Sequence, residues 1–189
     1  MGCHVPRLGV SPLQGESGGF DSHTVHQRSS KGPFRLERRL AGPGSSLKDM
    51  EKIKIALIAH DGMKADMVSF VTKRLEFFNR QDVDICATGT TGKFIKFAGV
   101  AKVQTLLSGP KGGDAQIAAM VASEEIDAVI FFRDPLDSHP HEPDVQMLMR
   151  VCDVHVVPLA TNYMSAKLLI DWFRSPENIA YWKKRKTED

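Results

Sequence analysis

The stretch that decides the fold is Ile53-Lys54-Ile55-Ala56-Leu57-Ile58-Ala59, and the polar sequence His60-Asp61-Gly62-Met63-Lys64 follows it at once. A short run that is apolar on both faces is typical of a parallel strand covered by helices on each side. The pattern predicts a strand over residues 54–59. Similar runs predict four more strands, over residues 84–87, 102–107, 128–132 and 155–159.

Helical patterns separate these strands. Met67, Val71, Leu75 and Phe78 follow the 3.6-residue period in the first of them. Alternation of strands and helices predicts an open doubly wound (Rossmann-like) α/β domain, a three-layer sandwich with a mainly parallel five-stranded sheet. Right-handed crossovers then place the carboxyl end of every strand at one edge, where such sheets bind ligands. The other predicted helices cover residues 93–98, 113–123, 143–153 and 162–174.

The composition changes at Met50, where we expect the domain 50–189 to begin. Residues 1–49 hold 8 of the 15 glycines and 4 of the 10 prolines and show no sustained apolar period. Such a segment buries too little surface to offset the entropy of ordering. We interpret 1–49 as a disordered or non-native extension. The alternative is an organelle transit peptide, but the acidic residues of segment 1–49 are atypical of one.

Charge and cysteine content exclude several classes of protein. Residues 50–189 carry 18 basic and 19 acidic residues, so the balance does not predict nucleic-acid binding. No apolar run approaches the length of a membrane span. Three scattered cysteines form neither a disulfide framework nor a zinc motif, which favours a reducing compartment, and we expect the cytoplasm.

Polar, glycine-containing sequence follows the predicted strands at their carboxyl ends. Thr88-Gly89-Thr90-Thr91-Gly92 offers amide and hydroxyl donors and precedes a helix start, which suits a phosphate monoester. It matches neither a Walker loop nor the dinucleotide fingerprint. Ser108-Gly109 is placed to close the same anion pocket, and Lys64 to supply positive charge. The competing interpretation is a plain strand-to-helix turn.

The acids at this edge allow two interpretations. Asp114, Asp61 and Asp144 each stand near a predicted helix start, where a carboxylate is more often a cap than a catalyst. A metal site built from the acidic loop between Asp134 and Asp144, with His139, His141 and Glu142, is a weaker alternative because no motif fixes its geometry.

Four motifs together resemble methylglyoxal synthase. They are His60-Asp61, Ala87 to Gly92, Ser108-Gly109-Pro110-Lys111-Gly112-Gly113-Asp114, and the sequence from Asp134-Pro135-Leu136 through Pro140-His141-Glu142-Pro143-Asp144-Val145. The resemblance extends through Pro158-Leu159-Ala160-Thr161-Asn162 and covers nearly all of residues 53–174. It implies conversion of dihydroxyacetone phosphate to methylglyoxal and inorganic phosphate through an enediolate. No metal or organic cofactor is then expected.

The resemblance also assigns roles to residues. It implies that Asp114 is the base that removes a proton, that His141 acts at the carbonyl and hydroxyl oxygens, and that Asp61 and Asp144 are supporting acids. Substrate binding, chiefly to its phosphate, is implied for His60, Lys64, Thr88, Gly89, Thr90, Thr91, Ser108, Gly109 and His141.

The partners expected are a small phosphate ester and other copies of the chain, in a homo-oligomer that the resemblance makes a hexamer. Nucleic acid and membrane are not expected. In some relatives a longer C-terminal segment carries an arginine to the neighbouring subunit's phosphate. Here Lys183, Lys184 and Arg185, in a short basic tail, are the candidate substitutes for that arginine, although none aligns with it residue by residue. Two other functions stay open: a non-catalytic effector-binding domain of the same fold, and a metal-dependent phosphohydrolase.

Overall fold

The computed structural model of the protein describes residues 52–136 and 142–188. The expected boundary at Met50 and the segment 1–49 lie outside these residues. The described part contains one sheet of five strands in the order β3-β2-β1-β4-β5, and every neighbouring pair is parallel. The strands are β1 (Ile53–Ala59), β2 (Val83–Ala87), β3 (Val103–Thr105), β4 (Ala128–Phe132) and β5 (Leu159–Ala160). The predicted doubly wound parallel sheet is therefore confirmed.

The central strand β1 is apolar on both faces because both faces are covered. Ile55 and Leu57 belong to one core cluster, whereas Ala56 and Ile58 belong to the other. All four side chains are buried. Alternation of side chains across the sheet thus explains why the deciding stretch carries no polar face.

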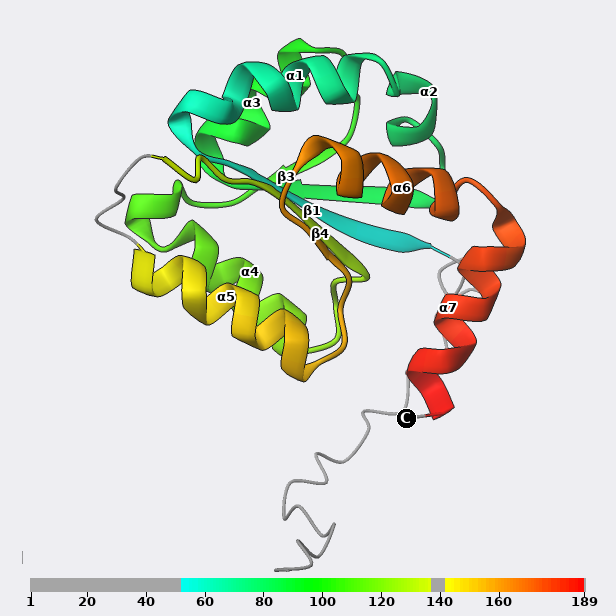
Figure 1. Cartoon of the computed structure of the whole chain (residues 1–189). Coiled ribbons are helices and arrows are strands. Elements are labelled where there is room, and N and C mark those ends of the chain that lie inside the picture. The colour runs from blue at the N-terminus through cyan, green and yellow to red at the C-terminus, as the bar shows by residue number, and fades with distance from the viewer. Residues whose placement is uncertain (1–51, 137–141, 189) are drawn as a thin grey trace, which may run out of the picture. The chain divides into compact units, whose positions relative to one another are not determined.

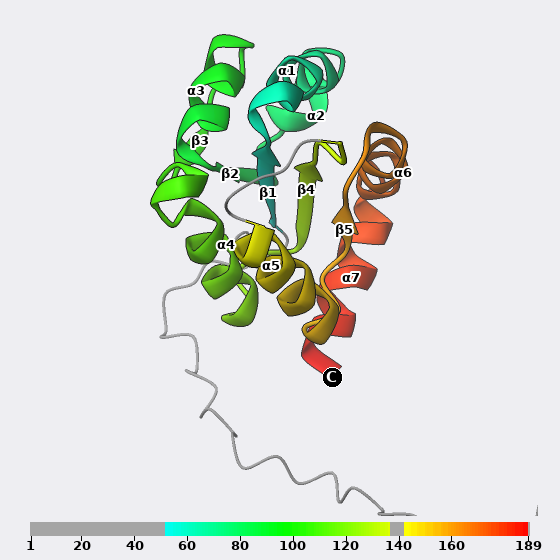
Figure 2. The ribbon, with the colours of Figure 1, turned by 60° about the vertical axis from the view of Figure 1, so that its left-hand side comes forward.

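Helices cover the two faces of the sheet in separate layers (Figure 1, Figure 2). Helices α1, α2, α3 and α6 pack on one face, where Phe70, Ile95 and Ile170 enter the larger core. Helices α4 and α5 lie side by side on the other face and contribute Ile117 and Leu148 to the second core. The bounds are α1 (Lys64–Thr72), α2 (Leu75–Phe78), α3 (Gly89–Phe97), α4 (Gly113–Ala122), α5 (Glu142–Val154) and α6 (Tyr163–Phe173).

A last helix, α7 (Pro176–Glu188), occupies sequence that was interpreted as a basic tail. Its apolar residues Ile179 and Trp182 are buried in the larger core. Trp182 packs edge-on against Trp172 and Phe173 at ring-centroid distances of 6.4 and 6.3 Å. Two apolar anchors one turn apart therefore fix a helix whose remaining surface is charged.

Several other boundaries differ from the sequence prediction. The helix predicted from the period of Met67 to Phe78 is divided into α1 and α2, because the backbone leaves the helical conformation at Arg74 (φ −133°), and β3 ends at Thr105 instead of Leu107. Helix α3 starts at Gly89, so Thr-Gly-Thr-Thr-Gly forms its first turn instead of a loop before it. Strand β5 starts at Leu159, because α5 runs on to Val154 and Val156 then adopts a left-handed backbone conformation with φ of 54°. Helix C-capping overrides the strand preference of the valines there.

No helix in residues 52–136 and 142–188 is long and apolar enough to cross a membrane.

Candidate active site

The candidate site lies at the carboxyl edge of the sheet, where the segment after β2 contacts the one after β3 and the segment after β1 contacts the one after β4. The segment after β2 touches the one after β3 directly, because the Gly89 amide donates to the Leu107 carbonyl at 2.9 Å. A methyl group on Gly89 would stand 3.1 Å from the amide nitrogen of Ser108. The Thr-Gly turn and the Ser-Gly turn are therefore adjacent walls, as the sequence predicted.

The first turn of α3 forms one of these walls. The hydroxyls of Thr88 and Thr91 are buried and lie 3.2 Å apart in a hydrogen bond, whereas Thr90 is exposed. The Gly89 amide donates to the Leu107 carbonyl, so helix geometry leaves the amides of Thr90 and Thr91 without a partner inside the helix. Amides in this position are the predicted donors to an anion.

Asp114 stands on the second wall, in the first turn of α4, and only 6% of its surface is exposed. A methyl group on Gly109 would stand 3.1 Å from Asp114 Oδ2, so the carboxylate lies against the glycine of the Ser-Gly turn. The turn is held by the Ser108 carbonyl, which accepts from the amides of Lys111 and Gly113 at 2.9 and 3.0 Å. Asp114 and the Ser108-Gly109 turn are therefore neighbours in the structure.

Gly113 is required where the turn enters α4. A side-chain carbon at this position would stand 2.1 Å from the Leu107 carbonyl oxygen, far inside contact distance. Only a residue without a Cβ allows the start of α4 to approach the end of β3 so closely. The glycine preceding the acid therefore sets the position of Asp114.

His60 directly follows β1 and is oriented by the segment after β4. The amide of Asp134 donates to its Nδ1 at 3.1 Å, and its ring packs edge-on against Phe131. An Nδ1 that accepts a hydrogen bond carries no proton, so the proton of the neutral ring resides on Nε2, which is a donor. The sequence did not predict that Asp134 orients His60, because the donor is a backbone amide and not a side chain that a sequence motif could reveal.

Lys64 and Asp61 form an ion pair at the start of α1. The lysine side chain is mostly covered, while the aspartate side chain is 94% exposed. Asp61 makes no cap of the helix with its side chain; it lies instead in the short 3-10 turn η1 (Asp61–Met63). Lys64, the cation predicted to bind phosphate, and Asp61, one of the predicted supporting acids, are therefore neighbours on one segment.

Asp144 and His141 are the residues predicted for the site from the sequence that follows β4. Asp144 is half-buried in the first turn of α5, beside α4. His141 and His139 lie outside the described residues, as does much of the acidic loop. Within residues 52–136 and 142–188, no group of three His, Cys, Asp or Glu side chains could hold a metal ion.

The basic residues of the C-terminus lie away from this edge. Lys183 Nζ contacts the buried carboxylate of Asp127, at the amino end of β4, at 2.7 Å. Arg185 lies over the ring of Trp182 at 5.8 Å. Within the chain, Lys183 is therefore engaged in a structural ion pair at the opposite edge of the sheet.

Tyr163 is a residue of the carboxyl edge that sequence analysis did not single out. It starts α6 directly after β5 and packs against Phe70 and Phe132. A hydrogen bond from Arg74 holds the pKa of its phenol below the usual value. The hydrogen bond between Arg74 and Tyr163 places the buried Arg74 between α1 and α6, in the layer of helices that covers the larger core.

Known proteins of this architecture share both fold and sequence with the chain. The family model of the MGS-like domain matches residues 66–161. A methylglyoxal synthase from Elizabethkingia anophelis matches in structure with a TM-score of 0.59 and 40% identity, over 64% of this chain and 78% of that one. Fold and site thus define an MGS-like α/β domain.

Two curated relatives narrow the assignment. Methylglyoxal synthase of Carboxydothermus hydrogenoformans is 57% identical over 118 residues, which are 62% of this chain and 96% of the relative. Methylglyoxal synthase of Thermus thermophilus is 52% identical over 120 residues, 64% of this chain and 94% of the relative. The chain belongs to the methylglyoxal synthase family, a family of lyases.

Proposed function

We propose that the protein converts dihydroxyacetone phosphate to methylglyoxal and inorganic phosphate through an enediolate, without a metal or organic cofactor. Membership of the methylglyoxal synthase family supports the reaction. The observation that carries the proposal is the position of Asp114, a buried carboxylate against Gly109 in the turn that adjoins the first turn of α3. The proposed base thus lies in the turn beside the proposed phosphate-binding turn.

In the proposed reaction Asp114 removes a proton from the hydroxyl-bearing carbon of the substrate. Proton abstraction next to a carbonyl by a positioned carboxylate contributes on the order of 10²–10⁴-fold. The electron pair of the C–H bond forms the enediolate, whose oxygens need donors already in place. We assign this task to His141 and to Nε2 of His60, with Asp61 and Asp144 as supporting acids.

Loss of phosphate completes the reaction. The enediolate electrons form a new C=C bond to the carbon that carries the phosphate, while the C–O bond breaks and its electron pair leaves with the phosphate. The resulting enol then takes up a proton at that carbon to give methylglyoxal. This requires the C–O bond to stand roughly perpendicular to the enediolate plane. Lys64 and the donors of Thr88, Gly89, Thr90, Thr91, Ser108 and Gly109 would hold and neutralise the departing phosphate, with the amides of Thr90 and Thr91 as its nearest helix-end donors.

We also infer a closed homo-oligomer, a hexamer by family resemblance, that works in the cytoplasm. Light scattering coupled to size-exclusion chromatography tests the assembly. A monomer at micromolar concentration would contradict it.

The decisive experiment incubates the full chain with dihydroxyacetone phosphate and follows phosphate and methylglyoxal separately. Equal amounts of both products, unchanged by excess chelator, support the proposal. Phosphate with dihydroxyacetone as the co-product, abolished by chelator, would instead show a metal-dependent phosphohydrolase. Binding of the substrate with no product at high enzyme concentration would show an effector-binding domain.

A further inference from the structure

Helix α6 is apolar on both of its faces, although only one of them meets the domain. Three inner side chains are fully buried in the larger core: Ala166, Ile170 and Phe173. Met164, Leu168 and Trp172, each four residues after the last, are 61%, 66% and 36% exposed. We call these three side chains the outer stripe of α6. A helix that is apolar all round is normally buried all round, so the outer stripe indicates a partner.

The outer stripe forms one row along the side of α6 that faces away from the domain. Residues four apart stand nearly above one another in a helix, whereas Leu168 and Ile170, two apart, point to opposite sides. The row is about 12 Å long. Beside it, Lys167 Nζ contacts Asp171 Oδ2 at 2.7 Å. A helix that lies on an anionic membrane carries cations that meet the lipid, so this paired flank favours a protein partner.

The domain holds α6 rigidly without a partner. At its first turn the Ser165 amide donates to Asn162 Oδ1 at 3.0 Å, and the Asn162 amide donates to Ser165 Oγ at 3.3 Å. At its last turn the ring of Trp172 packs edge-on against Phe173 and Trp182, at centroid distances of 4.9 and 6.4 Å. A surface that is already ordered loses little conformational freedom on association, which favours binding.

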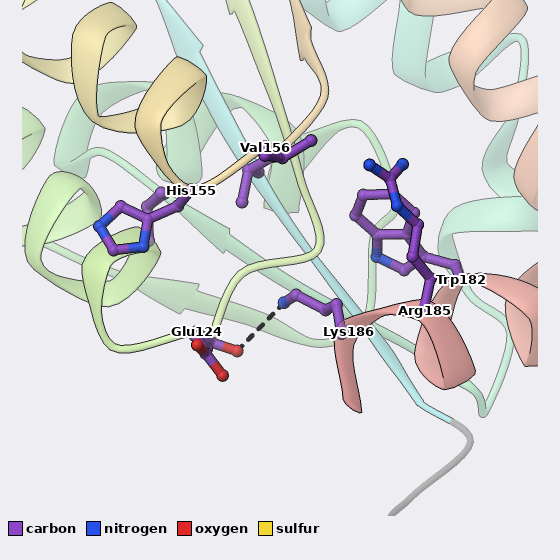
Figure 3. A pocket seen from close by; sticks show the side chains of 8 residues that line it. Glu124, His155, Val156, Trp182, Arg185 and Lys186 are labelled. Carbon is purple, nitrogen blue, oxygen red and sulfur yellow. Dashed lines mark hydrogen bonds between the residues drawn. The ribbon is translucent and has the colours of Figure 1, made fainter. Parts of the chain in front are cut away.

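Helix α7 adds an exposed aromatic residue near the end of this stripe. The side-chain amide of Asn178 donates to the Trp172 carbonyl at 2.8 Å, and Tyr181, three residues later on the same side of α7, is 64% exposed. Lys186 donates to the Glu124 carbonyl at 3.2 Å, which fastens the far end of α7 to the domain (Figure 3). The outer stripe and Tyr181 therefore belong to two helices that are both fixed in place.

The outer stripe is complementary to itself. Met164 and Trp172 lie four residues on either side of Leu168. When two copies cross antiparallel about a two-fold axis at Leu168, this residue meets its equivalent in the second copy, and Met164 meets Trp172 at both ends. A thioether against an aromatic ring is a favourable contact. Contacts of one patch with itself about a two-fold axis are the commonest way in which copies of a chain associate.

We propose that two copies of this chain meet through the outer stripes of their α6 helices, antiparallel and with the two-fold axis at Leu168. The contact deepens the homo-oligomer inferred above, on which it rests, by naming one of the faces that build it. It does not rest on the proposed reaction. In a hexamer made of two rings of three chains, a two-fold contact of this kind joins one ring to the other.

The test measures the mass of the full chain by sedimentation velocity at micromolar concentration. L168E and L168K each place like charges against each other at the axis. We therefore expect each variant to sediment at half the mass of the unmodified assembly, with the Kd of the contact raised at least about tenfold. An equal mixture of L168E and L168K places opposite charges at the axis and should restore the full mass, which also shows that both variants fold.

Val154, at the end of α5, supplies the matched control, because its exposure of 65% equals that of Leu168 closely. V154E and V154K should each keep the mass of the unmodified chain. Full mass of L168E alone, half mass of its mixture with L168K, or dissociation of V154E to the same extent would each overturn the proposal. So would binding of the unmodified chain to phosphatidylglycerol vesicles that L168E abolishes, since lipid would then be the occupant.

The outcomes separate this contact from the earlier proposals. A monomeric unmodified chain would overturn the inferred homo-oligomer and this contact together, whereas an assembly that survives L168E would overturn this contact alone. Turnover of dihydroxyacetone phosphate is measured separately, so failure of the proposed reaction is distinguishable from both.

Discussion

The two edges of the sheet each hold a buried aspartate, and the two are used in opposite ways. At the amino edge, Asp127 is 1% exposed and accepts from four donors: the Lys54 amide at 2.8 Å, Lys183 Nζ at 2.7 Å, and Lys186 Nζ and Trp182 Nε1 at 3.3 Å. At the carboxyl edge, Asp114 is 6% exposed and lies against the glycine of a turn.

The surroundings of each carboxylate, and not its burial, indicate its role. A buried charge that is surrounded by cations and N–H donors from distant segments fastens those segments together. A buried carboxylate whose approach is lined by glycine leaves room for a reacting molecule. We therefore expect changes at Asp114 to act on turnover and changes at Asp127 to act on stability.

The largest effect is expected from D114N. The amide keeps the shape of the side chain but is no longer a base, so kcat for methylglyoxal formation should fall by about 10²–10⁴-fold while orthophosphate binding and Tm stay nearly constant. Coupled assays of both products and calorimetry with orthophosphate measure these quantities. D153N, which neutralises an exposed acid at the far end of α5, should keep full turnover. Turnover of D114N within about tenfold of the unmodified chain would contradict the assignment of the base.

The next effect concerns the turn that positions this acid. In G113A the new Cβ would stand 2.1 Å from the Leu107 carbonyl oxygen, so backbone must move and we expect a loss of about 3 kcal/mol of unfolding free energy. Turnover should fall as well, because Asp114 is the next residue. Gly112 is the control: its φ is 92° but no atom within 4 Å meets an added Cβ, so G112A should cost only about 1–2 kcal/mol. Urea unfolding measures the loss of unfolding free energy in both variants. Equal losses in G113A and G112A would refute the steric explanation.

The same contrast explains what could be predicted from the sequence. The strand over residues 128–132 is observed with the predicted ends, because a fully buried parallel strand is marked by its own apolar run. The proximity of the Thr-Gly and Ser-Gly turns follows from topology alone. Features held by distant partners were missed: the basic stretch of α7 becomes a helix anchored by Asp127, which lies 56 residues before Lys183 in the chain.

Helix caps and backbone hydrogen-bond donors, which no side-chain pattern reveals, explain the other features that the sequence did not predict. His155 to Val157 have the composition of a strand, but the bond from Val157 N to Cys152 O ends α5 there instead. The tautomer of His60 depends on the amide of Asp134, which any residue other than proline at that position would supply. His141, the predicted partner of Asp114 in catalysis, lies outside the described residues, so its role stays a prediction.

At the amino edge we expect D127N to lower the free energy of unfolding by about 2–3 kcal/mol, since two lysines lose their shared counter-charge in a mostly buried setting. Residual turnover of the folded fraction should be unchanged. D171N is the control, because Asp171 pairs with Lys167 and Arg174 at the surface, where such pairs contribute about 0–1 kcal/mol. Equal stability of D127N and D171N would show that Asp127 does not fasten α7.

The smallest effect tests the second core, which lies between these edges and contains both Cys86 and Cys152. Burial raises the pKa of the Cys86 and Cys152 thiols from 9.0 to about 11. The folded state therefore keeps the thiols protonated while the unfolded state ionises, so their contribution is complete below pH 9 and is lost as pH rises through about 11. This amounts to about 1 kcal/mol per thiol between pH 9 and 10.

Other groups also titrate in this range, so the measurement is the difference between the unmodified chain and C86A/C152A in urea unfolding at pH 8, 9 and 10. The double variant loses packing at every pH, but its unfolding free energy should decline less steeply above pH 9. If both chains lose stability with the same slope, the two thiols ionise alike in the folded and unfolded states. Water would then have to reach the second core, to which β2 and α5 contribute these two cysteines, and the burial of the thiols in that core would be wrong.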